Sequence, residues 1–409
     1  MMKKAFSLLS IILLMSMVVL AGCGGGKSSK AGEKIVIFQS KVEITDQLKA
    51  LAKDYEKEKG VKVEVWETTG DDYFQQLKTK LSSKQGPSIF TLGGLTEGEQ
   101  LKSYAYDLSN QDFMKNVAPE KELLVDGKKV GLPYGIEGYG LVYNKSLVKP
   151  EDVKDYDSFN NTLKSLKAEG INGLGLSQES YFLIAHILNT PFALLDDPEA
   201  FIEKLNKGEV KMADTKEFQE FAKFMESIRA ESYNPLEYNY DKQIGDFATG
   251  KTAMIHQGNW AYGMFKDYGD LGFEMGMLPL PLMGNDKISV GVPSYWAVNA
   301  DADQKEIDAA LDFLNWLTTS ETGQHYIVDE FGFIPAMTNI EAKDLDPLSK
   351  DLLQASNSGK SIPWTFNLWP AGIVDADLAP ATQEFFIKKD MTGQQFLESL
   401  DAAWANATK

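Results

Sequence analysis

The chain has 409 residues and carries 59 acidic against 41 basic side chains, which gives a net charge of −18. This acidic balance excludes nucleic acid as a partner, because the phosphate backbone would be repelled. The single cysteine excludes an intrachain disulfide, and the length exceeds what one hydrophobic core organises, so we expect two domains.

The N-terminus has the pattern of an export signal. Lys3 and Lys4 precede the apolar stretch AFSLLSIILLMSMVVLAG, which ends in small residues directly before Cys23. We therefore predict a signal peptide over residues 1–22. A permanent membrane span is the alternative, but the stretch is near the short end for crossing a bilayer and no positive flank follows it directly.

The motif LAGC resembles the lipobox of bacterial lipoproteins, in which the cysteine receives a diacylglycerol and becomes the new N-terminus. The resemblance implies that lipid on Cys23 holds the protein on the outer face of a membrane. A buried or stray thiol is the alternative, but it would leave the position of this cysteine unexplained. Glycine and serine dominate the residues that follow, so we expect 23–34 to be a flexible tether.

The first globular segment has the pattern of a β-α-β unit. KIVIFQS predicts a buried strand, ITDQLKALAKDYEKEKG an amphipathic helix that ends at a glycine, and VKVEVWET a second strand. Such a unit belongs to a parallel sheet, so we expect an α/β fold. A helix over DDYFQQLKTKLSSKQG then leads to the short strand PSIFTLGG, and strand ends of this kind line ligand crevices.

Three later segments have the pattern of crossings between domains. VGLPYGIEGYGLVYNKSLV carries a proline and glycines between apolar runs, KISVGVPSYWAVNA is strand-like around Pro293, and FIPAMTNI follows a helical stretch. Helices are predicted between them over DSFNNTLKSLKAEG, YFLIAHILNT, TKEFQEFAKFMESIRA and KEIDAALDFLNWLTTSETGQHYIVDEFG.

These segments, in this order, resemble the extracellular solute-binding proteins of bacterial carbohydrate ABC importers, the family of maltose-binding protein. The motifs that carry the resemblance are PYGIEGYGLVYNKSL, FATGKTAMIHQGNW, LDFLNWLTTSETGQHYI, FGFIPAM and TGQQFLESLDAAW. It implies two α/β lobes with a ligand cleft between them and three hinge crossings. We expect one lobe over 35–136 and 294–336, and the other over 137–293 and 337–409.

The resemblance also implies a sugar site, which needs aromatic rings for the apolar face of a pyranose and polar side chains for its hydroxyls. The expected ring-bearing contacts are Tyr181, Trp260, Tyr295, Trp296, Trp364, Phe366 and Trp369. The expected polar contacts are Gln39, Glu97, Glu137 and Glu179. Core packing is the alternative for the rings, above all for Trp260 and Trp296. Within the family, GVPSYWAVNA is similar to receptors for raffinose-type and other short oligosaccharides.

Enzymatic chemistry has little support in the sequence. His186, His256 and His325 lie far apart with no cysteine partner, and neither GxSxG nor a P-loop occurs, so we expect no metal, no cofactor and no catalysis. The expected partners are an oligosaccharide and the membrane permease of an importer, and we expect a monomer. A polyamine or another non-sugar solute is the first alternative ligand, and a secreted glycan-active enzyme is the second alternative.

Overall fold

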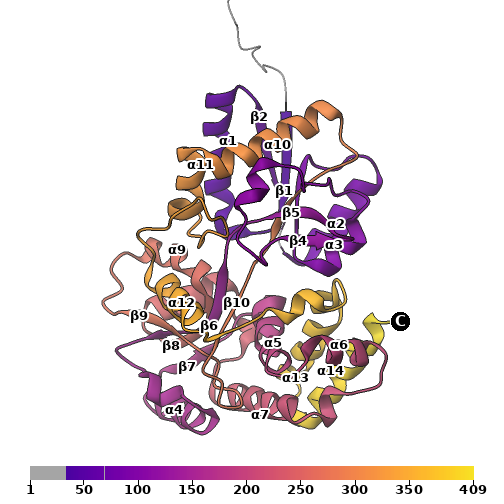
Figure 1. Cartoon of the computed structure of the whole chain (residues 1–409). Coiled ribbons are helices and arrows are strands. Elements are labelled where there is room, and N and C mark those ends of the chain that lie inside the picture. The colour runs from indigo at the N-terminus through magenta and orange to yellow at the C-terminus, as the bar shows by residue number, and fades with distance from the viewer. Residues whose placement is uncertain (1–33, 69) are drawn as a thin grey trace, which may run out of the picture.

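The computed structural model describes residues 34–68 and 70–409. The expected signal peptide 1–22, the lipidation site Cys23 and nearly all of the tether lie outside these residues. Lys34, the last residue of the expected tether, is the first residue of strand β1 and pairs with Lys62. Two lobes lie one above the other, and segments from both halves of the sequence contribute to the upper one (Figure 1). Among the described residues, none of the helices has the length and apolar character needed to cross a bilayer.

The first lobe is built on a six-stranded sheet of order β2-β1-β3-β11-β5-β4. Its strands are β1 (Lys34–Gln39), β2 (Lys62–Glu67), β3 (Ile89–Leu92), β4 (Leu123–Val125), β5 (Lys128–Pro133) and β11 (Tyr295–Val298). Strand β1 runs parallel to β2 and β3, whereas β11 comes from far along the chain and lies antiparallel between β3 and β5.

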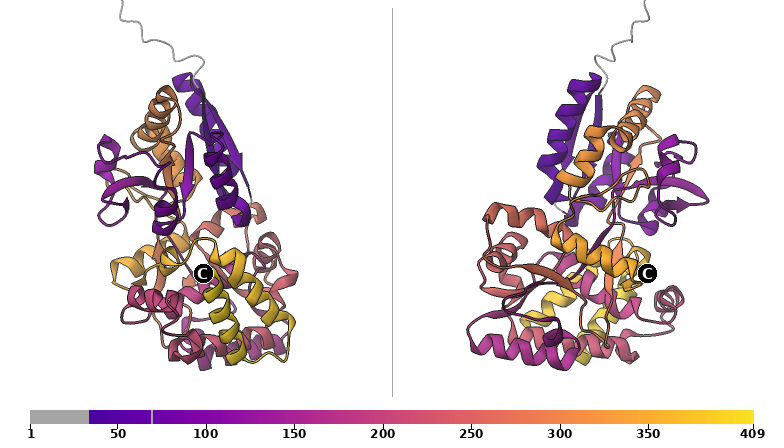
Figure 2. Two further views of the ribbon diagram at one scale, coloured as in Figure 1. Left: turned by 90° about the vertical axis from the view of Figure 1, so that its right-hand side faces the viewer. Right: turned by 60° about the vertical axis from the view of Figure 1, so that its left-hand side comes forward.

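Helices cover both faces of this first sheet (Figure 2). They are α1 (Thr45–Lys59), α2 (Gly70–Ser82), α3 (Leu95–Leu101), α10 (Gln304–Thr319) and α11 (Glu321–His325). Helix α1 buries Leu48, Leu51 and Tyr55 at helical spacing against the sheet. It ends at Gly60, whose φ of 75° suits a residue without a Cβ and lets its N–H reach the Glu56 carbonyl.

The second lobe contains a sheet of order β12-β10-β6-β8-β7, and β9 also pairs with β6. Its strands are β6 (Glu137–Asn144), β7 (Asn172–Gly175), β8 (Thr252–Gly258), β9 (Met275–Leu278), β10 (Ile288–Gly291) and β12 (Ser361–Ile362). Its helices are α4 (Tyr156–Ala168), α5 (His186–Ala193), α6 (Pro198–Asn206), α7 (Lys216–Glu231), α8 (Tyr240–Ala248), α9 (Tyr262–Phe265), α12 (Pro347–Asn357), α13 (Ala379–Ile387) and α14 (Gly393–Ala407).

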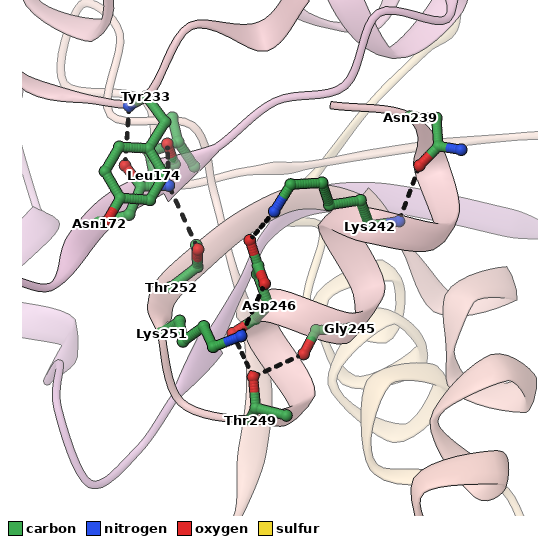
Figure 3. Close-up of polar contacts among 10 residues, drawn as sticks. All are labelled: Asn172, Leu174, Tyr233, Asn239, Lys242, Gly245, Asp246, Thr249, Lys251 and Thr252. Carbon is green, nitrogen blue, oxygen red and sulfur yellow. Dashed lines mark hydrogen bonds and ion pairs between the residues drawn. The ribbon is translucent and has the colours of Figure 1, made fainter. Parts of the chain in front are cut away.

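Figure 3 shows polar contacts between β7 and β8, within α8, and at the turn that joins α8 to β8. Asn172 on β7 donates to the Thr252 hydroxyl on β8 at 3.2 Å. On α8, Asp246 accepts from Lys242 at 2.7 Å and lies 3.5 Å from the Lys251 ammonium. The amide of Gln257 on β8 donates to Gln243 on α8 at 2.7 Å, so α8 is fixed relative to β8.

The chain passes between the two sheets at three places that lie side by side. The N–H of Tyr134 donates to the Ser294 carbonyl at 2.9 Å, and the N–H of Ile136 donates to the Ile334 carbonyl at 2.7 Å. These bonds join the first crossing to the second and third. Met337 and Ile340 still pack in the first-lobe core, so the third crossing enters the second lobe between Ile340 and α12.

Candidate ligand-binding site

A cavity of about 1140 Å³ lies between the two lobes. Its walls come from segments 42–49, 67–68 and 328–332 of the first lobe and from segments 240–241, 259–267 and 344–350 of the second. The first wall is the turn and helix start that follow β1, and the opposite wall is the start of α8 together with the turn after β8. A ligand in this cavity would contact both lobes, which is the arrangement that a cleft-binding receptor needs.

Trp260 forms part of the second-lobe wall and is only 8% exposed. It folds back over the end of β8 because Gly258 has no Cβ, which would lie 2.3 Å from the indole ring and 2.5 Å from the Gly138 carbonyl oxygen. Its indole N–H donates to Gln257 at 2.8 Å. A bond at 3.0 Å from the Gly138 N–H to the Asn259 side chain fixes the same turn. The ring is therefore held in one orientation at the cavity wall.

A buried ion cluster lies between the lobes beside Trp260. The Lys41 ammonium is 3.0 Å from a Glu137 carboxylate oxygen and 3.2 Å from Glu43, and it lies 5.6 Å from the centroid of the Trp260 ring. Burial lowers the pKa of Lys41, but the two carboxylates outweigh that effect and raise its pKa above the usual value. Lys41 thus remains protonated and connects the first-lobe turn to the start of β6.

Behind Trp260, a group of aromatic rings extends into the second lobe. Tyr139 stacks on His186 with centroids 4.2 Å apart, and Trp364 lies 5.5 Å from Tyr139 and 5.2 Å from Phe366. A turn of π-helix over 181–185 adds the rings of Tyr181 and Phe182. Aromatic rings that carry a polar group, such as tyrosine and tryptophan, suit ligands that present both C–H faces and hydroxyls.

Several polar atoms around these rings are buried without a hydrogen-bond partner among the described residues. They are the Tyr240 hydroxyl, Glu179 Oε2, His186 Nδ1 and Trp364 Nε1. An unpaired buried polar group costs about 1–3 kcal/mol, so proteins rarely collect several at one place without a reason. Of these four residues Tyr240 lines the cavity, so a polar ligand bound there would be placed to complete the hydrogen bonding of its hydroxyl.

Six of the residues expected at the ligand are brought together around this cavity and ring group. They are Glu137, Glu179, Tyr181, Trp260, Trp364 and Phe366. Glu179 also accepts a hydrogen bond at 2.9 Å from the N–H of Tyr240 at the start of α8. Which of these six touch a ligand stays a prediction.

Two further expected residues have an intramolecular role. Gln39 is buried and its amide bonds the Thr45 hydroxyl at 3.0 Å and the N–H of Lys41 at 2.5 Å, so it shapes the turn that carries Lys41. Glu97 accepts from the N–H of Gly93 at 2.7 Å, and burial raises its pKa. Neither side chain lines the cavity.

The other three expected residues lie in hydrophobic cores. Trp296 is 2% exposed and stacks on Tyr134 with centroids 4.0 Å apart, while Tyr295 packs on the opposite face of the first sheet. Trp369 is 2% exposed and lies 5.0 Å from Phe192 and 5.4 Å from Trp404. In this structure the three rings pack against neighbouring side chains and do not line the cavity, so their contact with a ligand stays a prediction.

Sequence reasoning missed Lys41 and Tyr240. Lys41 follows the first strand by two residues, so the argument that placed Gln39 at a strand end applied to it equally. Tyr240 belongs to none of the motifs that were singled out, and its position depends on how α8 packs. No local pattern could have identified it.

His186 and His256 are buried in the second lobe. Within the described residues, no group of three or more His, Cys, Asp or Glu side chains is placed to hold a metal ion. His256 is buried, its Nδ1 lies 3.0 Å from the Gly140 carbonyl oxygen, and burial lowers its pKa to about 4. Burial also lowers the pKa of His186 well below its usual range. Both rings are thus neutral at physiological pH.

Comparison with known families identifies the architecture. A family model described as "Bacterial extracellular solute-binding protein" matches residues 50–355. The chain belongs to this family. The solute-binding-protein resemblance seen in the sequence is thereby confirmed.

Individual relatives agree with this assignment. The galactooligosaccharide-binding protein of Bacillus subtilis (strain 168) is 26% identical over 347 residues, which cover 78% of each chain. A structure of the solute-binding protein RafE in complex with raffinose has a TM-score of 0.78 at 20% identity and covers 92% of this chain and 100% of that chain. A Bacillus licheniformis sugar transporter in complex with stachyose has a TM-score of 0.75 at 19% identity, covering 91% and 100%. At these identities the structural likeness confirms the two-lobed solute-binding fold.

The packing of Trp369 predicts a large effect of its removal on stability. Replacing a core tryptophan by alanine typically lowers the free energy of unfolding by about 3–5 kcal/mol, so Trp369→Ala is expected to fall in this range in urea denaturation without ligand. Trp66→Ala is the matched control, because Trp66 is only half-buried on β2 and should cost less. Unchanged stability in Trp369→Ala would contradict the core assignment.

The burial of His256 predicts acid sensitivity. Its folded pKa of about 4 lies below the ordinary value near 6.5, so between these pH values the unfolded chain binds a proton that the folded protein excludes. Stability should be complete above about pH 6.5 and fall as the pH drops toward 4, at about 1.4 kcal/mol for each pKa unit. Urea denaturation across this range measures the slope. His256→Gln should flatten it in part, and an equal slope in the variant would refute the assignment.

Proposed function

We propose that this solute-binding protein captures an oligosaccharide between its two lobes and presents it to an ABC importer. The observation that carries the proposal is the position of Trp260, an aromatic face fixed in the wall of a cavity of about 1140 Å³ that both lobes line. Three relatives support it, since their names or complexes concern a galactooligosaccharide, raffinose and stachyose.

The chemistry around Trp260 suits a sugar. One face of a pyranose ring consists of C–H bonds that pack on an aromatic ring, and its hydroxyls need donors and acceptors. The Glu137 carboxylate and the Tyr240 hydroxyl are polar groups near Trp260 that a hydroxyl belt would match. Because unpaired polar groups are costly, these side chains would discriminate between sugars more strongly than the rings.

We further propose that ligand binding closes the cleft by hinge motion at the three crossings. The proposed lobes are 35–136 with 294–336, and 137–293 with 337–409, except that residues 337–340 move with the first lobe. The packing of Met337 and Ile340 in the first-lobe core supports this adjustment. The hydrogen bonds between neighbouring crossings would make them bend as one unit.

The anchoring of the protein is also a proposal. We infer that residues 1–22 are removed and that lipid on Cys23 holds a monomer on the outer face of the cytoplasmic membrane, next to the permease subunits that receive the ligand. The basis is the lipobox-like LAGC and the apolar stretch before it. We propose no catalytic activity, and the family supports a binding role.

Calorimetry of residues 24–409 against raffinose, stachyose, galactooligosaccharides and maltodextrins tests the binding function. We expect saturable binding of at least one of these sugars and recovery of unchanged sugar afterwards. Trp260→Ala should weaken that binding at least tenfold, because loss of the ring removes about 0.5–1.5 kcal/mol of contact geometry in addition to buried area. Trp66→Ala is the control, because Trp66 is a half-buried tryptophan that does not line the cavity. If none of these sugars binds, or if Trp260→Ala binds normally, the proposed site is wrong.

The lipid anchor is tested by the Cys23→Ser variant in the native host. Without the thiol no thioether to diacylglycerol forms, so we expect the variant to be released to the medium or to remain uncut. Membrane fractionation and the mass of the mature N-terminus distinguish these forms. Retention of a processed variant in the membrane would argue for a different anchor.

A further inference from the structure

The interlobe cavity carries a strong excess of negative charge. Three of its lining residues are lysines, namely Lys49, Lys266 and Lys350. Nine are acidic, namely Glu43, Asp46, Glu67, Asp241, Asp267, Asp329, Glu330, Asp344 and Asp346. The difference is six negative charges on the wall of one cavity. A neutral sugar needs carboxylates only as hydrogen-bond acceptors and gains nothing from such an excess.

Some of these carboxylates are compensated within the chain. Glu43 pairs with Lys41 at 3.2 Å and Glu67 with Lys49 at 3.0 Å. Asp46 lies in the first turn of α1, where a negative charge is favoured by the helix dipole. Asp329 and Glu330 lie 2.6 Å and 3.4 Å from the His325 ring nitrogens, and Asp346 caps α12 by accepting from the N–H groups of Leu348 and Ser349. Asp241 lies in the first turn of α8. Among the described carboxylates that line the cavity, only Asp267 and Asp344 have no such compensation.

Asp267 and Asp344 are the clearest uncompensated pair. Asp267 lies in the turn after α9 and Asp344 in the loop before α12, and both are exposed. Neither forms an ion pair or hydrogen bond with any other described residue at the mouth of the cavity. Their charge is therefore available to a molecule that enters.

Beside the cavity wall, next to Glu43 and Trp260, the protein already stabilises an ammonium group. The Lys41 ammonium lies between the carboxylates of Glu43 and Glu137, with the Trp260 and Phe333 rings 5.6 Å and 5.7 Å away. Two carboxylates and two aromatic faces form an environment that favours a cation. A second ammonium from a ligand would meet the carboxylates that line the cavity.

Tyr240 provides an independent indication of a ligand. It lines the cavity, is 7% exposed, and its hydroxyl has no hydrogen-bond partner among the described residues. Burial raises the pKa of Tyr240 well above its usual value, and the charges of Glu43, Glu137 and Glu179 raise it further. The phenol thus keeps its proton among carboxylates of both lobes, and its oxygen is free to accept an N–H.

From this arrangement we propose that the ligand is an oligosaccharide that carries at least one protonated amino group. The inference rests on the proposed function and specifies its substrate class. Trp260 supplies the face for a sugar ring, while the carboxylates at the mouth supply the attraction for the ammonium. A linear polyamine presents the same ammonium groups without a sugar ring. The experiment must therefore distinguish an amino-bearing oligosaccharide from a polyamine.

Calorimetry of residues 24–409 with matched saccharides tests the inference. The probes are the tetramers of glucosamine and of N-acetylglucosamine, which share ring number and linkage but differ in charge, with stachyose, maltotetraose and spermidine as references. At mildly acidic pH we expect the glucosamine tetramer to bind at least tenfold more tightly than its N-acetylated counterpart and than the neutral references. Added salt should reduce this preference, because it screens exposed charges.

The possible outcomes separate the inference from the proposed function. If a neutral tetramer binds as tightly as the glucosamine tetramer or more tightly, the inference is overturned while the oligosaccharide function stands. If spermidine binds and no saccharide does, both are overturned. If nothing in this set or among the sugars named above binds, the proposed function falls together with the inference.

Variants of Asp267 and Asp344 at the mouth of the cavity test whether these carboxylates cause the preference for the glucosamine tetramer. Asp267→Asn combined with Asp344→Asn removes two charges with little change of shape, and should weaken binding of the glucosamine tetramer by roughly threefold to tenfold. Asp390→Asn, an exposed carboxylate outside the cavity, is the matched control and should bind normally. Equal affinity in the double variant and the control would overturn the proposal.

Discussion

The ion pair between Lys41 and Glu137 is the interaction on which the geometry of the cleft depends. It joins the turn after β1, in the first lobe, to the first residue of β6, in the second lobe, at 3.0 Å. Taking two charges out of water costs several kcal/mol for each ion, and only close partners offset this cost. Lys41 has a second carboxylate, Glu43, and two aromatic faces. Loss of Lys41 would leave the Glu137 carboxylate buried without its cation, whereas loss of Glu137 would leave Lys41 paired with Glu43 alone.

Close backbone approach is the second constraint on the site. A Cβ on Gly138 would lie 2.1 Å from Leu352 and 2.7 Å from the Ser289 carbonyl oxygen, so α12 and β10 can pack on β6 only because this residue is glycine. Gly258 allows the Trp260 ring to fold over the end of β8 in the same way. The aromatic wall of the cavity is thus fixed by the packing of the second sheet, and the charged wall by the turn after β1.

The sequence allowed the fold to be predicted because its periodicities are local. The strand, helix and strand expected at the start of the globular part are β1, α1 and β2, and a family motif directed attention to Trp260. The core rings could not be sorted in this way. Trp296 lies on a strand of a sheet that is covered on both faces. The alternation of side chains along this strand therefore could not predict which ring reaches a cleft. Trp369 directly follows the helical turn over 365–368 and packs in the second-lobe core, whereas Trp364 before that turn belongs to the ring group behind Trp260. Contacts between distant segments decide both positions.

The central claim is that an oligosaccharide binds on Trp260 between the lobes. A crystal structure of residues 24–409 with a saccharide identified by calorimetry tests it most directly. The account predicts a sugar ring lying flat on the Trp260 indole, with hydroxyl or amino groups within hydrogen-bond distance of Glu137 or Tyr240 and contacts to both lobes. A ligand bound elsewhere, or in contact with one lobe only while Trp260 remains covered by protein, would contradict it.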